Sequence, residues 1–443
     1  MRPTALVVGG GWAGLSCAVS LVQQGYSVTL LEAAPQLGGR ARSIRFGQLD
    51  VDNGQHLLLG AYHQTLALLR DMGHSESELF TRLPMQLQLN NGSNETVTLG
   101  LSRWLPAPFN LAWALLRLQG CSWAERLQAL GFALRMRVLL FRLAEDQGLY
   151  ALLRSYQQSP ALITKLWEPL CLATMNTPIH EASAQLFLNV LRDSFTRSAR
   201  DTDILLPESD IGQLLPALAA DWLAQHEARV LPGHRVSQLL RDAQGRICGV
   251  ANGETHFPAT HVVLACAAGE SEKLLQPHTE THALCSALQQ LGSYPITTIY
   301  LRYAEAVALP FPLYGLLGTT SQWLVDRAHC QQADLLAVVI SGPGPHMTME
   351  RAELARQVIT ELAQRLPHLA TPLEHMVVRE KRATFRAVAG VNNYRPSHQT
   401  ALPGLWLAGD YTLGPYPATL EGAVQSGVQC ARQILQHDRE KEH

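Results

Sequence analysis

The hydrophobic positions near the N-terminus follow two different periods. Residues 5–8 form a short apolar run that is typical of a buried β-strand, and residues 12–24 repeat apolar positions at helical spacing. Residues 28–31 form a second apolar run. Gly25 separates the expected helix from that second strand, which is where a glycine commonly ends a helix. This order predicts a β-α-β unit.

Strand-like patterns return in two later parts of the chain. Residues 229–250 are β-rich, with a turn at 242–245, and an apolar strand follows at 261–265. Residues 405–408 predict another strand, which precedes a glycine turn and a final helix at about 419–436. We expect these parts to join the N-terminal unit in one nucleotide-binding domain. That domain would be assembled from residues 1–56, 206–270 and 395–443.

The intervening parts predict a second domain. Residues 57–205 read as a helical block, and residues 271–394 as a mixed block with strands near 296–303, 335–341 and 375–385. We expect these two parts to form a substrate domain of sheet and helices, with the helical block as its cap. The predicted fold class is therefore α/β: a discontinuous Rossmann-like domain with a mixed sheet-plus-helix substrate domain.

One helix of the predicted cap has two apolar sides. On a helical wheel of residues 127–143, one stripe runs through Leu127, Leu130, Leu134, Val138 and Phe141, and a second through Phe132, Met136, Leu139, Leu140 and Leu143. Arginines fall between the stripes. Such a helix buries one side in the core and the other against a second helix, a lipid surface or an apolar ligand.

Composition narrows the class of protein. The chain has 443 residues, of which 47% are hydrophobic and only 16% charged, which excludes a disordered or fibrous protein. The 35 Lys and Arg against 37 Asp and Glu give a formal net charge of −2, so no positive field favours nucleic acid. The eight Cys show no spacing typical of metal ligands. We therefore expect reduced thiols, no metal site and no nucleic-acid partner.

The expected location is the cytoplasm. The N-terminus lacks the charged start and cleavage site of a signal peptide, and no uncharged apolar stretch is long enough to span a bilayer. Peripheral attachment to the inner face of a membrane stays open. The region 104–143 suggests it, because Trp and Pro residues near its start resemble a membrane-dipping segment. Core packing is the simpler alternative for the same residues.

A glycine motif at the first turn carries the clearest chemistry. Residues 9–14 read Gly-Gly-Gly-Trp-Ala-Gly, a G-x-G-x-x-G pattern that follows a strand and opens a helix. Gly9 permits the tight turn, Gly11 lets backbone N–H groups approach a pyrophosphate, and Gly14 lets helix and strand pack closely. Glu32 ends the second strand, where an acidic residue accepts both ribose hydroxyls. The motif predicts a dinucleotide, either NAD or FAD.

Two further motifs separate these cofactors. Residues 37–42 read Leu-Gly-Gly-Arg-Ala-Arg and resemble the glycine-doublet motif of the FAD-dependent amine oxidase and phytoene desaturase superfamily. Residues 407–410 and 417–423 resemble the second flavin motif of that superfamily. The resemblance implies FAD as cofactor. Arg40 can neutralise phosphate charge and Asp410 can hold ribitol hydroxyls. The N-terminus of the last helix offers positive potential to a reduced flavin.

A narrower resemblance covers almost the whole chain. Residues 52–62, 169–178, 381–385 and 417–423 resemble the hydroxysqualene dehydroxylases of bacterial hopanoid synthesis, also called squalene-associated FAD-dependent desaturases. The resemblance implies an FAD-dependent oxidoreductase that converts hydroxysqualene, an apolar isoprenoid, into squalene. It also suggests contact with other squalene-pathway enzymes. The electron donor is left open.

The residues expected to bind the cofactor come from these motifs, from the segment that passes near the flavin in this superfamily, and from one position near the adenine. They are Gly9, Gly11, Trp12, Ala13, Gly14, Glu32, Gly38, Gly39, Arg40, Gly54, Gln55, His56, Val236, Gly409, Asp410, Thr419, Leu420, Glu421 and Ala423. Val236 matches a position with a backbone contact to adenine, although a Val in a strand is also an ordinary core residue.

Two residues are candidates for catalysis. Replacing an allylic hydroxyl by hydride requires an acid that protonates the departing oxygen. His56 is the first candidate, because imidazole titrates near working pH and the segment passes near the flavin in this superfamily. The alternative is a His that fixes its own loop or binds a flavin oxygen. Lys381 is the second candidate, and an ordinary ion pair is its alternative.

Three other functions share parts of this pattern. Desaturation of a carotenoid-like polyene uses the same flavin motifs with hydride flowing the other way. Amine oxidation fits less well, because Thr419 occupies the place where those enzymes have an aromatic residue. A prenyl-lipid binding module without flavin chemistry would not need the complete set Gly9, Gly11, Gly14, Glu32 and Asp410.

Overall fold

The computed structural model describes residues 2–92 and 95–442. One of its two large sheets is parallel and has five strands in the order β10-β2-β1-β14-β20. The strands come from the three parts of the chain that predicted a nucleotide-binding domain. They are β1 (Thr4–Val8), β2 (Ser27–Leu31), β10 (Arg229–Leu231), β14 (His261–Leu264) and β20 (Leu405–Leu407).

Both faces of this sheet are covered, as the unbroken apolar character of β1 requires. Ala5 and Val7 contact a cluster with α1 (Trp12–Gln23), α10 (Leu215–Gln225) and α14 (Leu420–Glu442). Leu6 and Val8 lie on the other face of the sheet. They belong to a cluster with residues of β11 (Gln238–Arg241), β12 (Ile247–Asn252), β13 (Thr255–Pro258), α11 (Ala268–Leu275) and α12 (His282–Gln290). The sheet is thus a doubly covered α/β layer structure.

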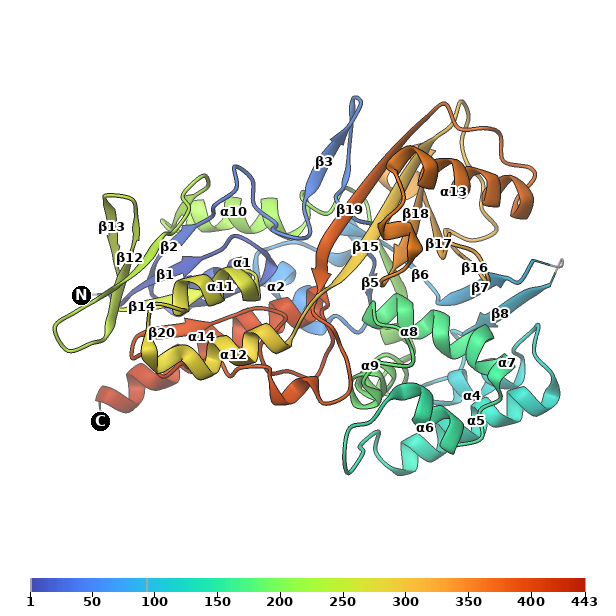
Figure 1. Ribbon diagram of the computed structural model, residues 1–443, viewed down its shortest axis with the longest axis horizontal. Coiled ribbons are helices and arrows are strands. Elements are labelled where there is room, and N and C mark those ends of the chain that lie inside the picture. Colours follow the sequence, from blue (N-terminus) through green and yellow to red (C-terminus); the bar gives the residue numbers. More distant parts are fainter. Residues whose placement is uncertain (1, 93–94, 443) are drawn as a thin grey trace.

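A second, mixed sheet has seven strands in the order β19-β15-β18-β17-β16-β7-β8. The helix α13 (Arg351–Arg365) covers one of its faces. Figure 1 shows this sheet with α13 at the end of the molecule opposite the two termini. Its strands are β7 (Gln86–Asn90), β8 (Thr96–Gly100), β15 (Tyr294–Arg302), β16 (Leu313–Leu316), β17 (Trp323–Arg327), β18 (Gln332–Ser341) and β19 (Glu374–Thr384).

The block at 57–205 is not purely helical, which corrects the sequence expectation. Its strands are short. β7 and β8 form a local hairpin that joins the seven-stranded sheet. β5 (Leu58–Leu59) and β6 (Phe80–Leu83) pair with the distant β9 (Ile204–Pro207). A further hairpin joins β3 (Ser43–Phe46) to β4 (Leu49–Asp52).

The remaining helices form the expected cap, at the lower right of Figure 1. They are α4 (Phe109–Leu116), α5 (Trp123–Val138), α6 (Leu149–Ser155), α7 (Pro160–Leu162), α8 (Glu168–Met175) and α9 (Ala184–Phe195), with a π-helical turn at Ile163–Trp167. Two small helices, α2 (His63–Asp71) and α3 (Glu76–Leu79), precede them. The helix α5 ends at Val138, so the predicted helix through 143 is too long, and α14 extends past the predicted end at 436.

Candidate active site

One large cavity lies where the five-stranded sheet meets the seven-stranded sheet. Its volume is about 1020 Å³. All the residues predicted to bind the cofactor line it except Gly14. The opposite wall comes from the seven-stranded sheet and from α8 and α9. The sequence therefore pointed to one half of a shared site, and the fold supplies the other half.

The first glycine motif builds a wall of bare backbone. Gly9 has a φ of +115°, and a side chain at Gly14 would lie 1.9 Å from the carbonyl oxygen of Gly9. Gly14 therefore has the predicted role of letting α1 pack closely against the strand, and it does not line the cavity. A Cβ at Gly39 would lie 3.2 Å from the Cα of Gly11, so the two glycine motifs touch. Gly11 is the N-cap of α1 and brings no side chain that would cover the helix end.

Glu32 is held in place by the backbone beside it. Its carboxylate accepts hydrogen bonds from the amides of Gly10 at 2.6 Å and Ala34 at 2.7 Å. A carboxylate oxygen has room for more than one hydrogen bond, so the side chain can still accept from a ligand. The position at the end of β2 is the one expected for binding ribose hydroxyls.

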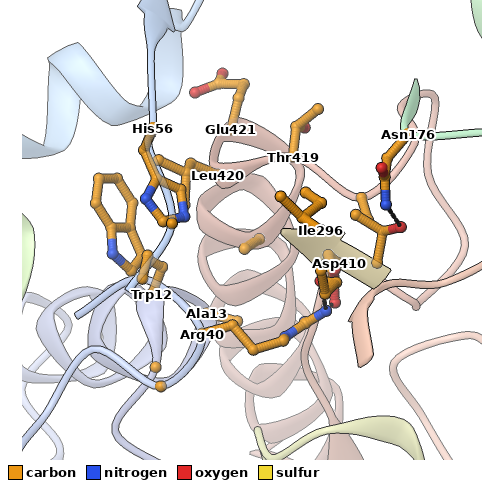
Figure 2. A pocket seen from close by; sticks show the side chains of 18 of the residues that line it. Trp12, Ala13, Arg40, His56, Asn176, Ile296, Asp410, Thr419, Leu420 and Glu421 are labelled. Atoms are coloured by element: carbon orange, nitrogen blue, oxygen red, sulfur yellow. Dashed lines mark hydrogen bonds and ion pairs between the residues drawn. The ribbon is translucent and has the colours of Figure 1, made fainter. Parts of the chain in front are cut away.

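Arg40 and Asp410 bind each other, a contact that sequence reasoning missed. The guanidinium of Arg40 donates to Oδ1 of Asp410 at 2.6 Å (Figure 2). It also donates to the carbonyl of Ala383 at 2.9 Å. Asp410 is the largest cause of the raised pKa of Arg40. The pair thus joins the glycine-doublet motif to the second flavin motif, 370 residues away along the chain. Its net charge is neutral, which reduces the charge that Arg40 offers to a phosphate.

The start of α14 also faces the cavity, and Glu421 at this point is bonded to α2. Thr419 caps the helix through a hydrogen bond from the amide of Gly422 at 3.0 Å, and Leu420 and Ala423 line the cavity. The carboxylate of Glu421 accepts from the amides of Gln64 and Thr65 at the start of α2. Figure 2 shows this side chain directed away from Asp410 and Arg40. The Glu421 side chain thus fastens α2 at the cavity wall, and its contact with the cofactor stays a prediction.

His56 and Trp12 present unsatisfied nitrogen atoms. Among the described residues, Nδ1 of His56 and Nε1 of Trp12 are buried and have no hydrogen-bond partner. Burial lowers the pKa of His56, and the nearby Asp52 opposes that shift. Figure 2 shows both rings beside the first turn of α14. Buried polar atoms without partners indicate a ligand that supplies them.

The segment that holds His56 is anchored from behind. Gln55 accepts a hydrogen bond from the fully buried Arg327 at 2.8 Å, and Arg327 lies 3.5 Å from the carboxylate of Asp52. Tyr300 donates to the carbonyl of Asp52 at 2.7 Å. These contacts fix residues on both sides of Gly54, so the backbone near His56 is held rigidly. The strand β17 that carries Arg327 gave no such signal in the sequence.

Lys381 does not reach the cavity. It is exposed, whereas Glu380 before it lines the cavity. The two residues are adjacent in β19, and adjacent side chains of a strand point to opposite faces. The catalytic interpretation of Lys381 is therefore not supported by its position. Val236 does line the cavity, but it lies in the loop before β11 and not in a strand.

Asn176 is a cavity residue that the sequence did not single out. It ends α8 in a left-handed conformation, with a φ of +49°. Its amide donates to the carbonyl of Pro295 and to Oγ1 of Thr384, and its oxygen accepts from the amide of Gly342 at 2.6 Å. All three partners lie at one end of neighbouring strands of the seven-stranded sheet, at the start of β15 and at the ends of β18 and β19. Asn176 therefore fixes the helical cap against the sheet at the cavity wall.

The wall away from the glycine motifs is apolar. It is formed by side chains of the seven-stranded sheet and of α8 and α9, namely Met85, Leu87, Leu170, Phe187, Leu191, Ile296, Leu313, Trp323, Val325 and Val339. An apolar cavity wall with a few polar groups at one end is the usual form of a site for a large organic ligand. In the sequence these residues read only as ordinary core positions.

The residues present fit FAD. Two helix N-termini, those of α1 and α14, open onto the cavity, and glycines keep the first of them bare. Glu32 stands where a ribose is bound, and Trp12 and His56 offer unsatisfied nitrogens farther along. The cavity is also large enough for a dinucleotide and part of an apolar substrate. These features define a dinucleotide-dependent enzyme of the α/β class.

The chain belongs to the family described as flavin containing amine oxidoreductase, which matches residues 12–435. It is 29% identical to the hydroxysqualene dehydroxylase of Rhodopseudomonas palustris, over 98% of this chain and 99% of that protein. It is 26% identical to the protein of the same name from Zymomonas mobilis, over 97% and 99%. The resemblance to hydroxysqualene dehydroxylases is thus confirmed, and so is the prediction of an FAD-dependent oxidoreductase.

Proteins with other names also match the chain, in sequence or in fold. A zeta-carotene desaturase from Synechocystis is 23% identical over 97% of this chain and 96% of that protein. The structure of cyclohexylamine oxidase from Brevibacterium oxydans superposes with a TM-score of 0.69, at 16% identity, over 99% of this chain and all of that chain. At that identity the structural match shows the fold alone, which confirms the predicted α/β class.

Proposed function

We propose that the protein removes the hydroxyl group of hydroxysqualene reductively and forms squalene. In this reaction a C–O bond breaks and a C–H bond forms, and the two electrons and two protons consumed leave squalene and water as products. The observation that carries the proposal is the alignment of relatives named hydroxysqualene dehydroxylase with nearly the whole chain. The apolar wall of the cavity supports it, because a long hydrocarbon requires such a surface.

FAD, when bound and reduced, supplies the electrons as hydride. The chain itself has to hold the substrate, exclude water and deliver a proton to the departing oxygen. Phe187, Leu191 and Ile296 are among the side chains that can surround the hydrocarbon and keep the site dry. His56 is the proton donor in this proposal, because its imidazole lines the cavity and its Nδ1 is free for a ligand.

The environment of His56 suits a strong acid. Burial lowers the pKa of His56, so the imidazolium form gives up its proton more readily than an exposed one. The same shift reduces the protonated fraction at neutral pH. The reaction therefore requires a proton to enter the site before the C–O bond breaks.

The test is a product assay with the purified, yellow holoenzyme. Hydroxysqualene is added with an artificial reductant under anaerobic conditions, and the extract is analysed for squalene. We expect squalene in amounts that exceed the enzyme concentration. Conversion limited to the first turnover, or none, with a fully reduced and FAD-loaded enzyme would contradict the proposal.

Polyene desaturation is the second candidate function, because a carotene desaturase aligns with the chain almost end to end. It requires oxidised FAD and an electron acceptor, so the two reactions are separable in one experiment. The oxidised holoenzyme is given phytoene and a quinone acceptor. New conjugated double bonds, seen as absorption in the visible range, would favour this function over dehydroxylation.

A further inference from the structure

The helical cap exposes large apolar side chains that gather on two neighbouring helices and the loop before them. Trp104 is 94% exposed, Trp123 66% and Val138 77%. The complete group, here called the cap face, consists of Trp104, Phe109, Trp113, Trp123, Leu127, Leu134, Val138, Leu139 and Leu140. Only three other large apolar residues of the described chain are so exposed, and they lie far apart in sequence. Large exposed apolar patches mark binding surfaces.

The helix α5 has an exposed apolar side that belongs to the cap face and an opposite apolar side that is buried in the core. At about 100° per residue, Trp123, Leu127, Leu134 and Val138 fall within an arc of roughly 60°. All four are exposed, whereas Phe132 and Met136, on the opposite side, are buried. Phe132 packs edge-on against Trp167 at 5.2 Å between ring centroids. Of the two apolar stripes that the sequence indicated, the one through Phe132 and Met136 is buried within α5, and Leu127, Leu134 and Val138 of the other are exposed. Beyond the end of α5 the division does not hold, because Leu139 and Leu140 are exposed and Phe141 is buried.

Arginines frame the cap face. Arg117 lies over the ring of Trp113 at 4.7 Å, and Arg126 lies over Trp123 at 4.8 Å. Residues 101–143 contain six arginines, at 103, 117, 126, 135, 137 and 142, and a single acidic residue, Glu125. Glu125 is buried and caps α5 through the amide of Ser122. This segment is therefore strongly basic, in a chain whose formal net charge is −2.

We propose that the cap face docks onto an anionic lipid bilayer. Tryptophans next to arginines are typical of residues at a membrane interface, where the ring enters the headgroup region and the guanidinium meets lipid phosphate. The basic charge of the segment complements an anionic leaflet. In the described part of the chain no helix is long and apolar enough to cross a membrane, so α4 and α5 would lie along the surface.

A second, smaller cavity lies beside the active site, next to the residues that precede Trp104. Its volume is about 310 Å³, and its wall includes Leu101, Ser102 and Arg103, directly before Trp104. It shares Met85 and Thr202 with the large cavity. In this proposal a hydrophobic substrate dissolved in the bilayer enters the active site past Leu101 and Met85, although charged residues such as Arg103 and Asp203 also line the smaller cavity. This part of the proposal rests on the proposed function.

Docking is tested by flotation of the holoenzyme with vesicles. We expect it to float with vesicles of phosphatidylcholine and phosphatidylglycerol, to float less with phosphatidylcholine alone, and to be released by 0.5 M salt as screening predicts. The Trp104→Ser and Trp123→Ser variants should each bind about tenfold more weakly. Arg135→Gln and Arg137→Gln should each weaken binding about fivefold, on the anionic vesicles only.

Matched variants lie outside the cap face. Leu373 is 68% exposed and serves as the apolar control, as Leu373→Ser. Arg351 and Arg356 are exposed on α13 and serve as the basic controls, each changed to Gln. We expect these three to float like the unchanged protein. Visible flavin absorbance and melting temperature should stay the same in every variant, because all the altered side chains are exposed.

Two results would overturn the docking proposal. One is a holoenzyme that stays in the dense fraction with both kinds of vesicle at low salt. The other is a dimer on size exclusion that Trp123→Ser converts into a monomer, since the cap face would then be covered by a second copy of the chain. Neither readout requires turnover, so a failure of the proposed function leaves the docking test intact.

The entrance is tested with Leu101→Trp and Ser102→Trp, which fill the smaller cavity and leave the walls of the large one unchanged. We expect kcat/KM for vesicle-borne hydroxysqualene to fall at least tenfold while flavin content and flotation stay normal. Two variants are used in case one does not fold. Unchanged kcat/KM in a folded variant would place the entrance elsewhere, and absence of squalene from the unaltered enzyme would instead contradict the proposed function.

Discussion

At the scale of single residues, the pair Arg40–Asp410 decides how the two flavin motifs work together. Asp410 is 6% exposed and bonded to Arg40 at 2.6 Å, and Arg395 donates to the Asp410 carbonyl at 3.0 Å. A buried carboxylate that lost its partner would remain charged in a poorly solvated place. We therefore assign this pair the task of holding the Asp410 carboxylate in place at the cavity wall.

This role predicts coupled effects on FAD affinity. Asp410→Asn and Arg40→Gln should each weaken FAD binding by about 10- to 100-fold, because each removes a charged hydrogen bond. The double variant should lose less than the product of the two, since both disrupt one contact. Fluorescence titration of the apoprotein with FAD measures all four constants. Strictly multiplicative losses would show that the two residues act independently.

An amide substitution can distinguish proton donation by His56 from a purely positioning role of the same side chain. His56→Gln preserves hydrogen bonding but cannot release a proton, so turnover should fall by about 10²- to 10⁴-fold while FAD stays bound. His56→Ala is the companion variant. If Gln supports near-normal turnover and Ala does not, His56 positions a ligand and the proton comes from another group. Single-turnover kinetics with the reduced enzyme provide the measurement.

The pH profile gives an independent check on His56. Burial lowers the pKa of His56, so its proton is held only on the acidic side of the usual value for histidine. A reaction that requires imidazolium should therefore slow as pH rises through that lowered pKa. In His56→Gln the same limb of the profile should disappear. A limb that persists in the variant would belong to another group.

At the scale of elements, substitution of two helical glycines by alanine should change the free energy of unfolding in opposite directions. A methyl group at Gly14 would lie 1.9 Å from a backbone oxygen, whereas one at Gly131 in α5 meets no atom within 4 Å. Gly14→Ala should lower the free energy of unfolding by about 1–3 kcal/mol and impair FAD retention. Gly131→Ala should raise it by up to about 1 kcal/mol, because alanine favours a helix. Urea unfolding compares them, and equal effects would contradict the packing argument.

Glu421 links α14 to α2 and has a structural effect of its own. Its carboxylate accepts from Gln64, from both the amide and the hydroxyl of Thr65, and from Gln425. Glu421→Ala should lower the free energy of unfolding of the apoprotein by about 1–3 kcal/mol, because buried donors lose their acceptor. Glu440→Ala, on an exposed turn of the same helix, should leave it unchanged. An effect seen only with FAD bound would instead indicate a cofactor contact.

Local sequence signals were sufficient for some elements and not for others. The β-α-β unit and its glycine turn could be predicted because the strand period, the helix period and the glycines all lie within residues 4–31. The strands β7 and β8 carried a local signal that was missed, because apolar and polar residues alternate in both and the two pair in one hairpin. The pairing of β7 with the distant β16 could not be predicted. The outward stripe of α5 was read correctly as apolar. The exposure of that stripe depends on which elements pack against α5, and those neighbours could not be predicted from the sequence.

At the scale of the whole molecule, the active site forms only when the two sheets and the helical cap come together. The cofactor motifs could be predicted because glycine turns and helix starts have strict local requirements. Asn176, Arg327 and Trp323 could not, because their roles depend on partners in other elements: Asn176 joins α8 to the seven-stranded sheet, and Arg327 supports the segment of His56. Lys381 was misplaced for a related reason, since the face toward which a strand residue points depends on register.

This assembly predicts that FAD stabilises the protein as one unit. The cavity is lined by residues of both sheets and of the cap, so a ligand that fills it contacts every layer. Excess FAD at about 100 times its Kd should raise the free energy of unfolding by about 2.7 kcal/mol, since only the folded state binds it. Calorimetry of apoprotein and holoprotein should show a single transition that shifts upward. A holoprotein with one shifted and one unshifted transition would mean that FAD is held by the five-stranded layer alone, and that the seven-stranded sheet encloses substrate independently.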